Sequence, residues 1–117
     1  MAYKYMAIAP TPRDRSEKPS YEYEETLTAQ GNGSWVILPS DITVAVVSVI
    51  VSGGGQGKVQ SSTNLVSTLI AGSGETAFDW SAGAVGANTQ DVAKPCNGIR
   101  LVQTSVGGTV KIQINAR

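Results

Sequence analysis

Side chains that could support catalysis are few in this chain. It contains no His, and this removes the usual general base, the common nucleophile pairs that depend on His, and the commonest zinc ligand. Beyond residue 25 the only side-chain carboxylates are those of Asp41, Glu75, Asp79 and Asp91. No spacing among them singles out the acid pair that a glycosidase needs. The sequence therefore predicts a protein that is not an enzyme.

Metal and cofactor sites are not indicated either. The single Cys96 has no second thiol with which to form a metal site or an intrachain disulfide, and we expect it to be a small, buried, apolar residue. The Gly-rich segment 52–58 differs from a P-loop, which would have Gly in place of Ser52 and Ser or Thr in place of Val59. A dinucleotide-binding motif would have its third Gly in place of Lys58. We interpret the segment as a hairpin turn and expect no cofactor and no metal.

Two tryptophans and one arginine are further candidates for ligand contacts. Trp35 and Trp80 could stack against sugars, but each alternates with apolar or small neighbours, which favours a place in the core. Arg100 lies between Ile99 and Leu101, so we expect it to face solvent or a partner.

The composition indicates one β-rich domain. A chain of 117 residues has the length of a single domain that can bury a core without disulfides or metals. Its 13 Gly and many Val, Thr and Ser are typical of strands and tight turns. A formal net charge of zero argues against a nucleic-acid partner held by electrostatics.

The first residues lack the pattern of a signal peptide, and no apolar run reaches the roughly 20 residues of a membrane-spanning helix. We expect synthesis in the cytoplasm and no membrane partner.

The domain is predicted to be built around residues 42–51. Most of these residues are Val or Ile, which suits a strand. Both faces are apolar, so we expect a central strand that is covered on both sides. Because helix formers are scarce, we expect at least six strands and no helix longer than one turn. The residues expected in the core include Val44, Val46, Val49, Leu101 and Ile112.

Turn signals divide the rest of the chain into short strands. Residues 99–104 and 109–115 are predicted to form a hairpin, and the long irregular stretch 81–98 suits a crossover between two sheets. The pattern predicts an all-β fold, an antiparallel, jelly-roll-like β-sandwich. The expected strands are residues 26–29, 35–38, 42–51, 58–62, 65–71, 76–80, 99–104 and 109–115.

Residues 1–25 predict an extended N-terminal arm, which leaves residues 26–117 as the β-sandwich domain. They hold half of the charged side chains and all four tyrosines, and residues 10–20 are too rich in proline and charge to fold alone. Large apolar side chains suit an arm that lies on another protein, although a flexible leader with incidental aromatics is the alternative. We expect that removing residues 1–20 leaves the domain folded, with its thermal stability nearly unchanged. The predicted interface residues are Tyr3, Tyr5, Met6, Ile8, Tyr21 and Tyr23.

Several segments beyond residue 33 resemble the capsid decoration, or cement, proteins of tailed bacteriophages. The likeness is carried by residues 34–41, 42–51, 76–80, 96–102 and 108–114. It implies a small β-sandwich or jelly-roll domain with a terminal arm, bound to the outside of a phage head and made in the host cytoplasm. The implied partner is the major capsid protein, and the family supplies no catalytic residues.

Association with other copies is also expected, because the chain beyond residue 25 is poor in charge and the outer face of its central strand needs a cover. Two other functions stay open. One is another virion part, such as a head fibre, neck or tail protein. The other is a carbohydrate-binding β-sandwich module that would use Trp35 or Trp80.

Overall fold

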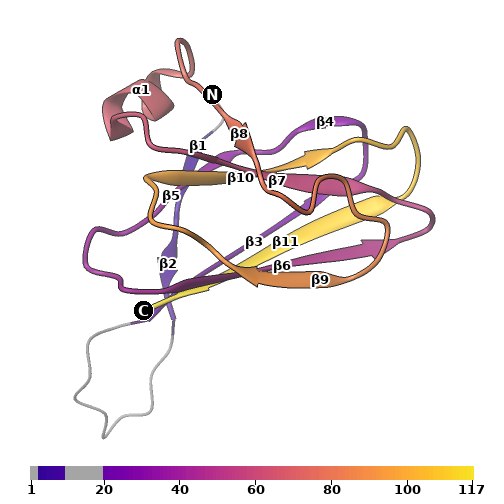
Figure 1. Cartoon of the computed structure of the whole chain (residues 1–117), viewed down its shortest axis with the longest axis horizontal. Coiled ribbons are helices and arrows are strands. Elements are labelled where there is room, and N and C mark those ends of the chain that lie inside the picture. Colours follow the sequence, from indigo (N-terminus) through magenta and orange to yellow (C-terminus); the bar gives the residue numbers. More distant parts are fainter. Residues whose placement is uncertain (1–2, 10–19) are drawn as a thin grey trace, which may run out of the picture.

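Short runs of alternating apolar and polar side chains form two β-sheets that pack face to face (Figure 1). The computed structural model describes residues 3–9 and 20–117. Sheet A has the strand order β1-β5-β10-β7-β8, with β4 also paired to β10, and sheet B has the order β2-β3-β11-β6-β9. The elements are β1 (Tyr3–Tyr5), β2 (Ala7–Ile8), β3 (Tyr21–Leu27), β4 (Gly31–Asn32), β5 (Trp35–Ile37), β6 (Ala45–Ser52), β7 (Gly57–Ser62), α1 (Val66–Ala71), β8 (Phe78–Asp79), β9 (Thr89–Val92), β10 (Gly98–Gln103) and β11 (Thr109–Ala116).

The strand pairs are nested in the sequence. β3 pairs with β11, β5 with β10, β6 with β9 and β7 with β8, and all four pairs are antiparallel. The strands from β3 to β7 therefore pair, in reverse order, with the strands from β8 to β11. The resulting pairs are divided between the two sheets. This is the wrapping of a jelly roll. The prediction of an all-β, jelly-roll-like sandwich is confirmed.

The core lies between the two sheets and is filled by alternate residues of the inner strands. Val49, Leu101 and Ile112 are buried there as expected. The prediction was wrong for Val44, which is exposed, and for Val46, which is only half-buried. Because side chains alternate across a strand, the inward positions of β6 exclude Val46. The main buried cluster comprises Met6, Val36, Ala45, Val47, Val49, Val59, Ile99, Leu101, Val110, Ile112, Ile114 and Ala116.

A short helix replaces the strand predicted at residues 65–71. With six residues α1 exceeds one turn, so the expectation of no longer helix was also wrong. Gly72 ends the helix in the left-handed conformation and donates its backbone N–H to the carbonyl of Thr68 at 3.2 Å. The helix forms because it buries Leu69 on the outer side of sheet A, against Trp35 and Ile37 (Figure 1).

Two expected hairpins are crossovers between the sheets. β10 belongs to sheet A and β11 to sheet B, so the prediction that residues 99–104 and 109–115 pair with each other was wrong. The Gly-rich segment 52–58 likewise carries the chain from β6 in sheet B to β7 in sheet A. Turn residues show that a chain reverses, but they do not show whether the next strand stays in the same sheet. The crossover expected within residues 81–98 is present, and it contains β9.

The N-terminal residues that the structure describes are part of the sandwich. β1 pairs in parallel with β5 at the edge of sheet A, and β2 pairs with β3 at the edge of sheet B. Met6, between β1 and β2, is buried in the main core. The boundary expected between residues 25 and 26 falls inside β3, which pairs with β11 along its length. The expectation of an extended segment at residues 10–20 concerns positions that, apart from residue 20, lie outside the described residues.

Gly98 is a point of close approach between α1 and sheet A. A Cβ atom there would lie 2.7 Å from Cδ1 of Leu69 and 3.3 Å from Cε3 of Trp35. Since both neighbours are buried, we expect Gly98→Ala to lower the free energy of unfolding by about 1–3 kcal/mol in a denaturant titration. Gly107→Ala is the matched control, because a Cβ there would meet nothing within 4 Å. Equal destabilisation by both variants would contradict this packing.

Burial of Met6 changes the expected effect of truncation. Removing residues 1–20 would delete β1, β2 and a core side chain, so we now expect a clear loss of thermal stability. The sharper test is Met6→Ala, which should lower the free energy of unfolding by about 2–3 kcal/mol through lost burial and a cavity. Ile8→Ala, in the same segment but exposed, should change it by less than about 0.5 kcal/mol. Wild-type stability of the Met6→Ala variant would show that the segment does not dock.

Candidate functional site

The six residues predicted as an interface gather at one edge of the sandwich, but only two of them are largely exposed. Tyr5 is 60% and Ile8 is 66% exposed, whereas Met6 is 8% exposed. Tyr3, Tyr21 and Tyr23 are half-buried. Met6 is thus buried within its own chain, and of the six only Tyr5 and Ile8 expose most of their surface; contact of these residues with a partner stays a prediction.

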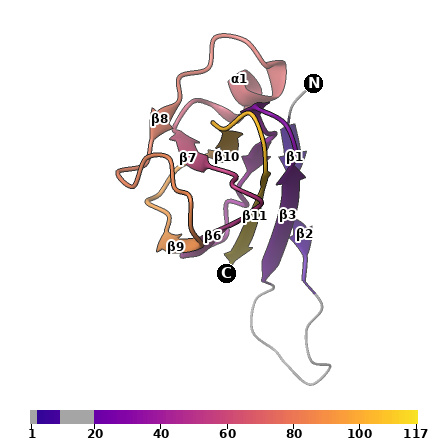
Figure 2. The same cartoon turned by 90° about the vertical axis from the view of Figure 1, so that its right-hand side faces the viewer.

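The local geometry explains this split. In the parallel register of β1 with β5, Tyr3 lies beside Trp35 and Tyr5 beside Ile37. Tyr3 packs on the small cluster under α1, and its ring meets the Tyr5 ring edge-on with centroids 5.7 Å apart. The chain then passes from the edge of sheet A to the edge of sheet B, along the side of the sandwich formed by β1, β2 and β3 (Figure 2).

Two tyrosine hydroxyls of β3 are bound within the chain. The Tyr21 hydroxyl donates to the Asp41 carboxylate, 3.0 Å from Oδ1 and 3.1 Å from Oδ2, and this contact raises the pKa of Tyr21. The Tyr23 hydroxyl donates to Oε1 of Glu25 at 3.2 Å. Burial, with the nearby Glu25 charge, raises the pKa of Tyr23 to about 12. Glu25 also accepts hydrogen bonds from the backbone N–H and the hydroxyl of Ser34. These tyrosines hold β3 in place and are not free for a partner.

A groove of about 450 Å³ runs beside β3 at this edge. β2 pairs only with Tyr21 and Glu22, although β3 continues to Leu27. Beyond Glu22, that edge of β3 has no strand partner among the residues that the structure describes. Lining the groove are Tyr5, Ala7, Glu22, Tyr23, Glu24, Gln113, Ile114 and Asn115.

Glu24 gives this groove an acidic wall that is held in position. Its Oε2 accepts a hydrogen bond from Nε2 of Gln113 at 2.6 Å and lies 3.5 Å from Nζ of Lys111. The hydrogen bond, and then the Lys111 charge, lower the pKa of Glu24, so it carries a negative charge at neutral pH. The groove therefore combines an exposed aromatic ring with a carboxylate that is held in position, which suits contact with a polar or basic protein surface.

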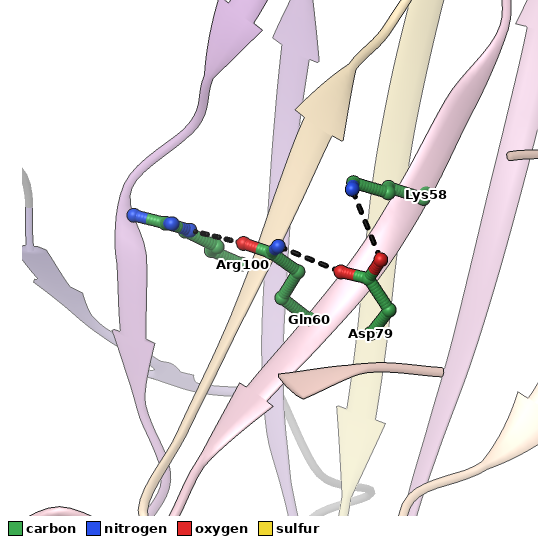
Figure 3. Close-up of polar contacts among 4 residues, drawn as sticks. All are labelled: Lys58, Gln60, Asp79 and Arg100. Atoms are coloured by element: carbon green, nitrogen blue, oxygen red, sulfur yellow. Dashed lines mark hydrogen bonds and ion pairs between the residues drawn. The ribbon is translucent and has the colours of Figure 1, made fainter. Parts of the chain in front are cut away.

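A row of polar side chains crosses the outer face of sheet A (Figure 3). Strand register places Arg100, Gln60 and Asp79 side by side on β10, β7 and β8. Nε of Arg100 donates to Oε1 of Gln60 at 2.8 Å, and Nε2 of Gln60 donates to Oδ1 of Asp79 at 2.7 Å. Nζ of Lys58 completes the row at 3.1 Å from Oδ2 of Asp79. The alternation of residues 57–62 was the signal in the sequence that Lys58 and Gln60 share this face.

Two further contacts hold the Arg100 side chain in place. Its guanidinium carbon lies 4.6 Å from the centre of the Trp35 ring, a cation–π contact, and Nη1 lies 3.9 Å from Oε2 of Glu75. Burial lowers the pKa of Arg100, and the Glu75 charge opposes that shift. Arg100 lies on the outer face of sheet A, as predicted. However, its guanidinium group is bound by residues of the same chain and is not presented to a partner.

The row has little capacity for proton transfer. Hydrogen bonds from Gln60 and Lys58 lower the pKa of Asp79, so the group is a carboxylate at neutral pH and is a poor proton donor.

Cys96 packs half-buried against the main core, and burial raises the pKa of its thiol. Within residues 3–9 and 20–117, no group of three or more His, Cys, Asp or Glu residues could hold a metal ion.

No family model, no curated protein and no solved structure matches this chain. In the part of the chain that the structure describes, no helix is long and apolar enough to cross a membrane. Function therefore has to be argued from the surfaces of the molecule.

Tyr23 provides a spectroscopic test of the β3 contacts. Because its folded pKa is about 12 and its ordinary value is 10, its contribution to stability is present below pH 10 and is lost as the pH rises towards 12. In an absorbance titration of the folded protein, one phenol should ionise with a midpoint near pH 12. Tyr23→Phe should remove that component, whereas Tyr5→Phe should keep it. A late component that survives in Tyr23→Phe would rule out this assignment.

Proposed function

We propose that this chain is a structural virion protein that binds the outside of a phage head and stabilises the capsid subunits, without catalysis. The observation that carries the proposal is the exposed apolar edge formed by Tyr5 and Ile8. These side chains are 60% and 66% exposed, and they lie on consecutive strands that belong to different sheets. Their positions are set by the buried Met6 between them, so the edge is rigid and not a loose tail.

The fold supports this role. Jelly-roll sandwiches are a common architecture of viral capsid and lectin domains. The likeness of residues 34–41 and 108–114 to capsid decoration proteins points in the same direction. Fold alone does not decide function, and the exposed side chains of Tyr5 and Ile8 are the more specific support.

The edge offers two modes of contact with a major capsid protein. Tyr5 and Ile8 can serve as apolar anchors, and Glu22 and Glu24 line the wetter groove that Tyr5 borders. The free edge of β3 beyond Glu22 can also accept an extended segment as an added strand. Contacts of modest strength would suffice, because many copies on one shell act together.

The docked state of residues 3–8 changes how binding works. A segment that is disordered before binding loses entropy when it docks, which lowers affinity for a given contact area. Here β1 and β2 are already paired with β5 and β3. Tyr5 and Ile8 are therefore presented before any partner arrives.

Association between copies belongs to the same proposal, and the outer face of sheet B supports it. Val46 on β6 is half-buried and lies opposite Val92 on β9, which is largely exposed. The cover that the sequence led us to expect over this face of β6 is therefore incomplete among residues 3–9 and 20–117. A second copy would supply it.

Capsids assembled without this protein provide the test of the edge. The Tyr5→Ser, Ile8→Ser double variant should bind such capsids at least about tenfold more weakly than the wild type in a cosedimentation assay, because both anchors are lost. The Leu65→Ser, Val106→Ser double variant removes two other exposed apolar side chains and should bind like the wild type.

Each alternative has its own outcome. Wild-type binding to necks or tails, but not to capsids, would assign the chain to another part of the virion. Equal capsid binding by the two double variants would contradict the role of the edge. Thermal melting of each variant checks that the domain stays folded.

A further inference from the structure

The opposite side of the sandwich carries a second opening, independent of the proposed capsid edge. β8 and β9 are the last strands of sheets A and B on that side (Figure 2). They are short, with two and four residues, and a cavity of about 370 Å³ opens there. Its lining residues are Ser61, Phe78, Asp79, Trp80, Ser81, Asp91, Val92 and Lys94.

Two aromatic side chains form the apolar part of this cavity. Phe78 lies opposite Ser61 in the β7–β8 register, yet it is 61% exposed. Trp80 is half-buried and packs against the main core, and its backbone N–H donates to the Val59 carbonyl at 3.0 Å. One ring is therefore anchored and the other is open to solvent. An exposed Phe on a paired strand beside a cavity contributes little to the core, but it offers a flat surface for a ligand.

The polar groups around the rings are also held by the chain. Asp79 lies at the rim of the cavity, but its carboxylate is bound by Gln60 and Lys58 on the outer face of sheet A. Oδ1 of Asp91 accepts the backbone N–H of Val92 at 2.8 Å, which leaves Oδ2 as a further acceptor. Lys94 is an exposed donor on the same wall.

This combination of groups selects a class of ligand. An anion would meet the carboxylate of Asp91, and a cation would meet Lys94. A neutral ligand with many hydroxyls suits both, because each hydroxyl can donate to a carboxylate and accept from an ammonium group. The apolar face of a sugar ring can lie on an aromatic side chain. The volume falls within the roughly 300–1,000 Å³ of ordinary ligand pockets.

We propose that the cavity between β8 and β9 binds a neutral saccharide of one or two rings. Phe78 and Trp80 provide the stacking surface, and the carboxylate of Asp91 accepts hydrogen bonds from its hydroxyls. The site lies on the side of the sandwich away from Tyr5 and Ile8 (Figure 2), so it stays open when that edge is occupied.

Saturation-transfer NMR of the full chain with maltose, cellobiose, lactose and N,N′-diacetylchitobiose tests the proposal, with sialyllactose as an anionic comparison. At least one neutral disaccharide should bind at millimolar concentration. Phe78→Ala should weaken its binding by roughly tenfold or more, because the stacking surface is lost. Asp91→Asn, which keeps Oδ1 but removes the charge, should also weaken it. Leu65→Ala, an exposed apolar residue outside the cavity, should bind like the wild type.

Three results would overturn the proposal. They are no binding of any neutral disaccharide, a dissociation constant unchanged in both Phe78→Ala and Asp91→Asn, and a preference for sialyllactose.

The natural ligand could be a glycan on a cell surface or a small soluble sugar, and an array of surface-linked chains of the same sugars separates these two sources. Binding to linked chains points to a glycan on a cell surface, and binding only to the free disaccharides points to a small soluble sugar. Either of these two patterns supports the site.

Discussion

The pairing of β11 with strands on both of its sides is the constraint on which the sandwich depends. β11 pairs with β3 from Val110 to Ala116 and with β6 from Thr109 to Ala116. Its inward residues Val110, Ile112 and Ile114 are almost fully buried. Because β11 lies between β3 and β6, these two strands belong to one sheet only through it. The pairs β5 with β10 and β7 with β8 lie between β3 and β11 in the sequence, and they form the other sheet by the same reversal of the chain.

Glu25 shows how the first strand of this pairing is kept in register. It lies opposite Ile112, on the inward side of β3, where a charge would be costly without partners. The hydroxyls of Tyr23 and Ser34 and the Ser34 backbone N–H supply those partners. A Cβ on Gly33 would lie 2.9 Å from the backbone oxygen of Leu101 and 3.0 Å from Oε1 of Glu25, so the close packing here favours Gly.

Local pattern in the sequence predicted individual strands better than their partners. The alternation of residues 109–115 was sufficient to identify β11 and to place Ile112 in the core. The same alternation could not show that β11 leaves β10 and joins β3, because pairing between distant strands is decided by burial of the whole sheet. Val46 illustrates the same limit. In a strand that is apolar on both faces, composition does not tell which face meets the other sheet.

The helix, and the pairing of the N-terminal strands with β5 and β3, were not predicted for a related reason. Residues 65–71 contain β-branched side chains that favour a strand, but burial of Leu69 on Trp35 and Ile37 outweighs that local preference. Residues 3–8 have no strand partner nearby in the sequence, since β5 and β3 lie well beyond them. Among the predicted interface residues, Tyr5 and Ile8 could be proposed from the chemistry of their side chains alone. The burial of Met6 between them depends on the junction of the two sheets.

The faces and the edges of this sandwich differ in what they can bind. On the outer face of sheet A, Lys58, Gln60, Asp79 and Arg100 form hydrogen bonds with one another, and Trp35 is covered by Arg100 and by the packing under α1. A partner on that face would have to displace satisfied polar groups and would gain little. At the edges the sheets end before their apolar side chains are covered. Binding there removes exposed apolar surface from water at a smaller polar cost, so the edges are where recognition by this fold is expected to take place.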